Sequence, residues 1–162
     1  MRVRVCAVVL GDGGICLIRR ERPAGVQYSL PGGLAEDGEP PLAALHRELG
    51  EELGLDTAAV DGPPVLRWVQ EQTSTRPGRD GVFRRRHLVF VLHLPPGARG
   101  TLATAELDAP DAAPIVWPDP ASAAGLHLYP AVGAVLARIG DTPPPTGPAL
   151  LPPMTDATYS WR

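Results

Sequence analysis

The chain has 162 residues, of which 44% are hydrophobic and 20% are charged. That length fits one domain with a sizeable hydrophobic core. The formal net charge of −3 gives no electrostatic reason to expect a nucleic-acid polymer or an anionic membrane surface as the partner. No export signal is evident, and no apolar run approaches the roughly 20 residues that cross a bilayer, so we expect a cytoplasmic protein.

The first 22 residues predict two strands. Residues 2–10 (RVRVCAVVL) and 15–22 (ICLIRRER) are separated by a glycine-rich turn, which is typical of a β-hairpin. Alternation places Arg19 and Arg20 on opposite faces of the second strand. One of them is therefore expected beside a ligand pocket, with a solvated strand end as the alternative. Cys6 and Cys16 lack metal-ligand spacing and are predicted to be buried free thiols.

A short strand at 28–30 leads through Pro31, Gly32 and Gly33 to a predicted helix over 41–53. Proline is common in the first turn of a helix, and glycine is common just after its last turn. Pro40, Pro41 and Gly54 therefore predict where the helix begins and ends. The leucines that recur at helical spacing predict a buried stripe. They are Leu42, Leu45, Leu49 and Leu53.

Three glutamates of this helix are related by three or four residues. Glu48, Glu51 and Glu52 therefore cluster on another face, with Cβ atoms roughly 5 to 6 Å apart. Three like charges at that spacing repel one another. A bound cation would remove the repulsion.

The rest of the chain predicts a mixed α and β architecture. Strands are expected at 65–72 and 85–93, joined by a polar loop over 73–84 that is a candidate substrate lid. A weaker strand at 101–106, a strand at 114–117 and a helix over 131–139 follow. Residues 1–140 are predicted to form one domain. Residues 141–162 read as a proline-rich tail, either extended or folded back through Leu150, Leu151, Tyr159 and Trp161.

The helix carries a motif with fixed spacing. Gly33 and Glu39 are followed by residues 47–55, RELGEELGL. This pattern matches every specified position of the Nudix box, G-x5-E-x7-R-E-U-x-E-E-x-G-U, in which U is aliphatic. The chain resembles the Nudix hydrolase family of the MutT type, although the box covers only residues 33–55. The order of elements is similar to that family's α/β/α sandwich with a mixed central sheet.

A carboxylate cluster without histidine or cysteine favours Mg²⁺ or Mn²⁺, which prefer oxygen ligands. The resemblance implies a metal site formed by the Gly32 carbonyl and the carboxylates of Glu48, Glu51 and Glu52, one of which also acts as a base. Arg47 completes the candidate catalytic set, because its planar fork of donors can hold glutamates in place. Gly33 and Glu39 are assigned supporting roles.

Two further groups of residues are open to more than one interpretation. Family members often supply another acid three residues before a late tryptophan. Trp117 resembles that tryptophan, but the corresponding position is Pro114. The remaining candidates are Glu71, Glu106, Asp108 and Asp111. The candidates for binding substrate phosphates are Arg20, Arg84 and Arg86, with a solvated strand edge as the alternative.

The leading hypothesis is divalent-metal-dependent hydrolysis of a diphosphate linkage in a nucleoside triphosphate or a nucleoside diphosphate derivative. The partner is then a small nucleotide, and a homodimer, common in the family, is left open. A non-catalytic nucleotide-binding sensor is the alternative. An isoprenoid diphosphate isomerase is a third reading, without support from Cys6 or Cys16. Counting from Leu55, Gln70 and Gln72 occupy positions that mark two subgroups by proline or tyrosine, so the substrate stays open.

Overall fold

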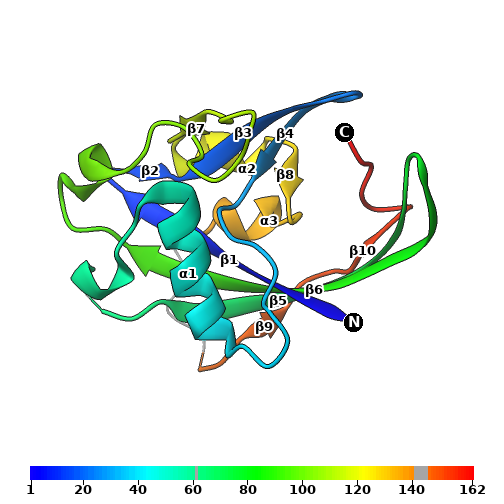
Figure 1. Cartoon of the computed structure of the whole chain (residues 1–162), viewed down its shortest axis with the longest axis horizontal. Helices are drawn as coiled ribbons and strands as arrows, with labels where there is room; N and C mark the ends of the chain where they lie inside the picture. Colours follow the sequence, from blue (N-terminus) through cyan, green and yellow to red (C-terminus); the bar gives the residue numbers. More distant parts are fainter. Residues whose placement is uncertain (61, 141–145) are drawn as a thin grey trace.

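The computed structural model describes residues 1–60, 62–140 and 146–162. These residues form two β-sheets and three α-helices (Figure 1). Both sheets combine parallel and antiparallel pairs, in agreement with the α/β class predicted from the sequence. Within the described ranges, no helix has the length and apolar character to span a membrane.

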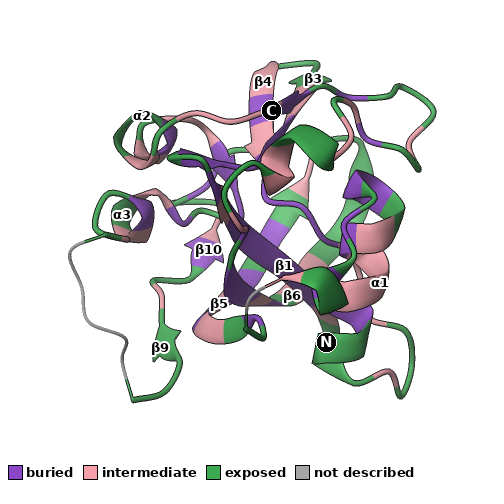
Figure 2. Ribbon diagram, turned by 90° about the vertical axis from the view of Figure 1, so that its left-hand side faces the viewer, coloured by how far each residue is buried: buried purple, intermediate pink, exposed green. Residues whose placement is uncertain are grey.

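The larger sheet has the strand order β10-β5-β6-β1-β2, and β9 also pairs with β5. Its strands are β1 (Arg2–Gly11), β2 (Gly14–Ile15), β5 (Val65–Arg76), β6 (Arg79–His93), β9 (Ala149–Leu150) and β10 (Met154–Thr155). β1 is parallel to β6, whereas β5 and β6 form an antiparallel hairpin. Six consecutive residues of β1, from 4 to 9, are buried (Figure 2), because the strand is covered on both faces.

The smaller sheet has the order β7-β3-β4-β8. Its strands are β3 (Leu17–Arg22), β4 (Gly25–Ser29), β7 (Ile115–Val116) and β8 (Leu128–Tyr129). The predicted hairpin of residues 2–10 and 15–22 is therefore correct only at its tip, where β1 pairs with β2. β2 ends at Ile15, and after Cys16 the chain continues as β3 in the other sheet. Cys6 and Cys16 are buried free thiols, as predicted.

Helix α1 (Pro41–Leu53) coincides with the predicted helix and covers one face of the larger sheet (Figure 1). Gly54 ends it in a left-handed conformation, and its N–H donates to the Gly50 carbonyl. Leu45, Leu49 and Leu53 are buried against the sheet, but Leu42 is 39% exposed, so the buried stripe is shorter than predicted.

The segments after α1 depart most from the prediction. A 3₁₀ turn, η1 (Thr57–Ala59), leads to β5. The expected polar loop over 73–84 is wrong, because β5 continues to Arg76 and β6 begins at Arg79. The long hairpin leaves only a tight turn, so there is no loop there to serve as a lid.

The strand expected at 101–106 is also absent from the described structure. It is replaced by a 3₁₀ turn, η2 (Ala98–Thr101), and an isolated bridge between Ala105 and Pro114. The late helix is short, α3 (Gly133–Leu136), and a further helix, α2 (Pro120–Ala124), precedes it.

The described part of the tail, residues 146–162, folds back on the larger sheet. β9 and β10 both run parallel to β5. Met154 and Tyr159 are 1% and 6% exposed, whereas Leu150 is 80% exposed. The start of the predicted tail, residues 141–145, lies outside the described residues.

Candidate metal centre

The segment before α1 is fixed to the free edge of β1. The N–H of Val5 donates to the Gly33 carbonyl at 2.9 Å, and the N–H of Ala7 donates to the Pro31 carbonyl at 3.0 Å. Gly32 lies between them with φ 131°, and a Cβ there would overlap the Val5 carbonyl and the Cys6 Cα. Only glycine fits this position. Its backbone therefore reaches the buried interior.

Glu52 lies at the buried end of α1, only 5% exposed, and faces this backbone. Its Oε2 accepts a hydrogen bond from the N–H of Gly32 at 2.6 Å, while Nη2 of Arg4 donates to the Gly32 carbonyl at 2.8 Å. Burial raises the pKa of Glu52 to about 8, although the Gly32 N–H and Arg4 favour its charged form. The nearby carboxylates of Glu106 and Asp108 raise this pKa further.

The loop that carries Glu106 and Asp108 is attached to the end of α1. The last carbonyls of a helix have no partner within it. Here the Ala103 N–H donates to the Leu53 carbonyl and the Leu107 N–H donates to the Glu52 carbonyl, both at 3.0 Å. These bonds bring Glu106 and Asp108 beside the Glu52 side chain.

Glu52, Glu106 and Asp108 form what we call the acidic group. One carboxylate oxygen of each lies within 4.8 Å of the others. In the part of the chain that the structure describes, this is the only set of three acids, histidines or cysteines so arranged. All its donors are oxygens, so the group fits a hard divalent cation such as Mg²⁺ or Mn²⁺.

Arg20 connects β3 to the acidic group. Its Nη1 and Nη2 donate to the two carboxylate oxygens of Glu106 at 2.7 and 2.5 Å. The side chains of Arg20 and Glu106 are only 16% and 4% exposed. Such a two-point pair fixes the orientation of the carboxylate as well as neutralising its charge.

Arg47 organises the other acids of α1. Its Nε and Nη2 donate to Glu39 at 3.0 and 2.9 Å, and its Nη1 donates to Glu48 at 2.8 Å and to Glu51 at 3.2 Å. Its hydrogen bond lowers the pKa of Glu39. Burial raises the pKa of Glu48 despite the same guanidinium. A Cβ at Gly33 would overlap the present position of the Glu48 carboxylate, so a side chain there would displace that carboxylate.

The structure separates the three glutamates of α1 that the sequence placed in one metal site. Glu52 lies in the acidic group, but Glu48 and Glu51 are held by Arg47 instead. Of the four candidate extra acids, Glu106 and Asp108 reach Glu52, whereas Glu71 pairs with Arg86 on the surface and Asp111 is exposed.

The arginines proposed for substrate phosphates are also separated. Arg20 pairs with Glu106 beside Glu52, while Arg84 is exposed and Arg86 is bound to Glu71. Sequence reasoning overlooked Arg4, which is 6% exposed and holds the Leu30 and Gly32 carbonyls. The signal that could have identified Arg4 is a charged residue directly before the apolar run at residues 5–10 of β1.

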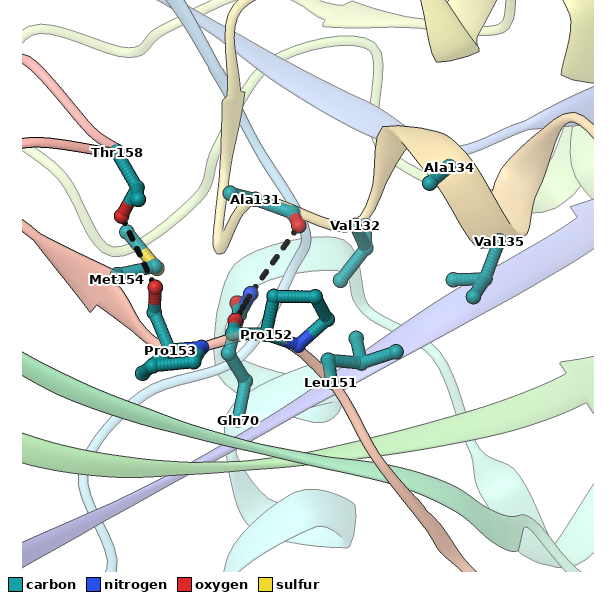
Figure 3. A pocket seen from close by; sticks show the side chains of 10 residues that line it. All are labelled: Gln70, Ala131, Val132, Ala134, Val135, Leu151, Pro152, Pro153, Met154 and Thr158. Carbon is teal, nitrogen blue, oxygen red and sulfur yellow. Dashed lines mark hydrogen bonds between the residues drawn. The ribbon is translucent and has the colours of Figure 1, made fainter.

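A separate pocket of about 210 Å³ lies between α3 and the tail (Figure 3). Its walls are mostly apolar, and the amide of Gln70 donates across it to the carbonyls of Ala131 and Pro152. None of its lining residues belongs to the acidic group.

Comparison with known proteins gives the family. The model of the NUDIX domain matches residues 1–137. No curated protein matches the chain. The MutT protein of Bacillus halodurans shares 17% identity at a TM-score of 0.63, covering 88% of this chain and 84% of its own. The E. coli ORF135 protein shares 26% identity at a TM-score of 0.56, covering 88% and 94%.

A MutT Nudix hydrolase from Burkholderia pseudomallei shares 25% identity at a TM-score of 0.52, covering 74% of this chain and 83% of its own. The sequence motif, the sandwich of elements and the domain match agree over most of the chain. The chain therefore belongs to the Nudix family.

Proposed function

We propose that this protein hydrolyses a diphosphate linkage in a nucleoside triphosphate or a nucleoside diphosphate derivative and depends on Mg²⁺ or Mn²⁺. The observation that carries the proposal is the convergence of Glu52, Glu106 and Asp108 within 4.8 Å of one another beside the Gly32 backbone. The substrate in this proposal is a small nucleotide in the cytoplasm, and a homodimer stays a prediction.

The residues have distinct roles in this proposal. Glu52 and Glu106, with Asp108 and the Gly32 carbonyl, would hold the cation, which supplies positive charge for the diphosphate oxygens and favours deprotonation of a bound water. Arg4 fixes the Gly32 carbonyl, and Arg20 holds Glu106 in its orientation. Hydrolysis at phosphorus needs mainly such positioning and charge stabilisation.

The proposal assigns Glu48 and Glu51 a role outside the acidic group. Both are joined to Arg47, which also binds Glu39 and the Leu34 carbonyl. Glu48 is nearly buried, with 12% of its side chain exposed, whereas the Glu51 side chain is 49% exposed. The exposed carboxylate is therefore the better placed to bind a metal-associated water or a second cation from solvent.

The test is a Mg²⁺- and Mn²⁺-supplemented assay of phosphate and pyrophosphate release over a panel of nucleotides. We expect turnover by the wild type, and loss of about a hundredfold or more in Glu52→Gln and Glu51→Gln. Glu21→Gln is the matched control, because Glu21 is exposed and pairs with Arg19. Full turnover by both Glu52→Gln and Glu51→Gln would contradict the proposed site. Tight nucleotide binding without turnover under either metal would favour the sensor alternative.

A further inference from the structure

A second concentration of charge lies at the far end of the β3–β4 and β5–β6 hairpins, where the tail crosses them. A pocket of about 340 Å³ is lined there by four arginines and an indole. We call it the basic pocket. Its lining includes Arg22, Gln27, Arg76, Arg79, Trp161 and Arg162.

The walls of the basic pocket are held in place by contacts between the three segments. Nε of Arg22 donates to Gln27, whose amide donates to the Tyr159 hydroxyl at 2.7 Å. Gln27 is only 3% exposed. Nη1 of Arg162 donates to the Ala24 carbonyl at 3.3 Å. The tail is therefore tied to the β3–β4 hairpin on one side of the pocket.

The other side is held by stacking. The guanidinium carbon of Arg76 lies 4.2 Å from the ring centre of Trp161 and 4.5 Å from that of Phe83. The two rings meet edge to face with centres 5.5 Å apart. Cations placed over aromatic faces are attracted to them and lose side-chain freedom before any ligand binds. Arg76 is thus preorganised in a wall that contains Trp161.

The guanidinium groups of the pocket lack carboxylate partners in the described structure. Among the described residues, none of its four arginines forms an ion pair with a carboxylate. Two acids on the same segments are bound elsewhere: Glu21 pairs with Arg19, and Asp156 accepts hydrogen bonds from Thr75. Burial lowers the pKa of Arg76, and the neighbouring charges of Arg79 and Arg22 lower it further. A bound anion would relieve this repulsion.

The position of the pocket relates it to the acidic group. Arg20 and Arg22 are two residues apart on β3, so their side chains point to the same face about 6 to 7 Å from each other. Arg20 extends to Glu106, and Arg22 lines the basic pocket. One face of β3 therefore carries both an arginine that binds the acidic group and an arginine that lines the basic pocket.

We propose that the basic pocket is a phosphate-binding site, with guanidinium donors for the oxygens of one phosphate group. Arginine binds phosphate with charge-assisted hydrogen bonds, and several arginines without carboxylate partners suit a doubly charged anion. The phosphate comes either from free inorganic phosphate or from the phosphate end of a nucleotide. In the second case the indole of Trp161 offers an apolar surface for the attached nucleoside.

The test measures equilibrium binding of inorganic phosphate, AMP and adenosine to the full chain by calorimetry, with a chelator present. We expect phosphate and AMP to bind and adenosine to bind at least about tenfold more weakly than AMP. AMP binding more tightly than phosphate would identify the nucleotide as the source, and equal affinities would identify the free ion. No detectable binding of either phosphate or AMP would overturn the proposal.

Arg79→Gln is the decisive variant, because Arg79 is exposed on the hairpin and is not part of the core. We expect it to weaken phosphate binding about fivefold to tenfold, and Arg22→Gln to do the same. Arg19→Gln removes the same charge from the opposite face of β3 and is expected to change affinity less than about twofold. Equal losses in Arg19→Gln and Arg79→Gln would overturn the proposal.

Glu52→Gln tells the two sites apart. We expect this variant to bind phosphate with the wild-type affinity in the presence of chelator, because the basic pocket does not include Glu52. A loss of phosphate binding in Glu52→Gln would locate the anion at the acidic group and overturn the proposal. Since neither metal nor turnover is involved, failure here leaves the proposed hydrolysis untouched.

Discussion

Arg20 and Glu106 lie 86 residues apart in the sequence and form a two-point ion pair with distances of 2.5 and 2.7 Å. The pair joins a strand of the smaller sheet to the loop that docks on the end of α1. It fixes one carboxylate of the acidic group, and its Glu106 side chain is buried while that of Arg20 is largely shielded from solvent. Its contribution to stability can be measured separately from the proposed hydrolysis.

Removing Arg20 leaves the Glu106 carboxylate buried without its cation. We expect Arg20→Gln to lower the free energy of unfolding by about 3 kcal/mol, measured by urea denaturation. The double variant Arg20→Gln, Glu106→Gln should lose less than the single variant, because no unpaired charge is left buried. The exposed pair Arg19 and Glu21 provides the control, with a much smaller effect expected from Arg19→Gln. Equal destabilisation by Arg20→Gln and Arg19→Gln would contradict the difference in burial between the Arg20–Glu106 and Arg19–Glu21 pairs.

Gly32 is required for two separate reasons, its positive φ and the space around it. We expect Gly32→Ala to lower the free energy of unfolding by about 3 kcal/mol or more, because its Cβ would overlap the backbone of Val5 and Cys6. Gly13 also has a positive φ, but nothing lies within 4 Å of its Cβ position. Gly13→Ala should therefore cost only about 1 kcal/mol. Similar denaturation midpoints for the two variants would show that close packing at Gly32 contributes nothing.

His87 makes stability depend on pH. It is fully buried, and burial lowers its pKa well below the ordinary value, helped by the charges of Arg4 and Arg85. The unfolded chain therefore binds the proton first as the pH falls through about 6.5. Stability is retained above that pH and falls below it, by at most about 1.4 kcal/mol per pH unit from this residue.

The check is urea denaturation at about pH 7 and about pH 5.5. Between the two pH values, the raised pKa of Glu52 makes the same stabilising contribution to both proteins as the pH falls. We therefore expect the change in free energy of unfolding towards about pH 5.5 to be more favourable in His87→Gln than in the wild type, even if the variant is less stable at both. His93 is exposed, so His93→Gln should keep the wild-type dependence. A wild-type dependence in His87→Gln would mean that His87 is not the responsible group.

The tail contributes to the stability of the domain through Met154. This side chain is 1% exposed and packs with Tyr129 and Tyr159. We expect Met154→Ala to lower the free energy of unfolding by about 2 to 4 kcal/mol. Leu150→Ala should change it by less than about 0.5 kcal/mol, because Leu150 is 80% exposed. Equal stability of Met154→Ala and wild type would mean that the tail does not pack on the domain in solution.

The features that could be predicted from the sequence are those fixed by residues close together in the chain. Helix α1 was predicted at its observed bounds because Pro40, Pro41 and Gly54 act within one turn of its ends. The hairpin of β5 and β6 was not predicted beyond residue 72, because polar residues such as Thr73 and Thr75 also suit a loop. Their strand pairing comes from partners across the sheet and from Asp156 in the tail.

The acidic group, too, could be predicted from the sequence only in part. The box located Glu52, but its spacing alone could not separate it from Glu48 and Glu51, whose positions depend on Arg47. Glu106 could be named only as one of four acids. The bonds from its loop to the last carbonyls of α1 join segments about 50 residues apart, and no local pattern encodes them.

Binding of Mn²⁺ tests the central claim most directly, because it needs no substrate. The affinity can be measured at constant pH by electron paramagnetic resonance of the free ion. We expect Glu52→Gln to weaken Mn²⁺ binding at least about tenfold, and the control Glu21→Gln to bind as the wild type does. Unchanged Mn²⁺ affinity in a folded Glu52→Gln variant would contradict a metal centre at the acidic group.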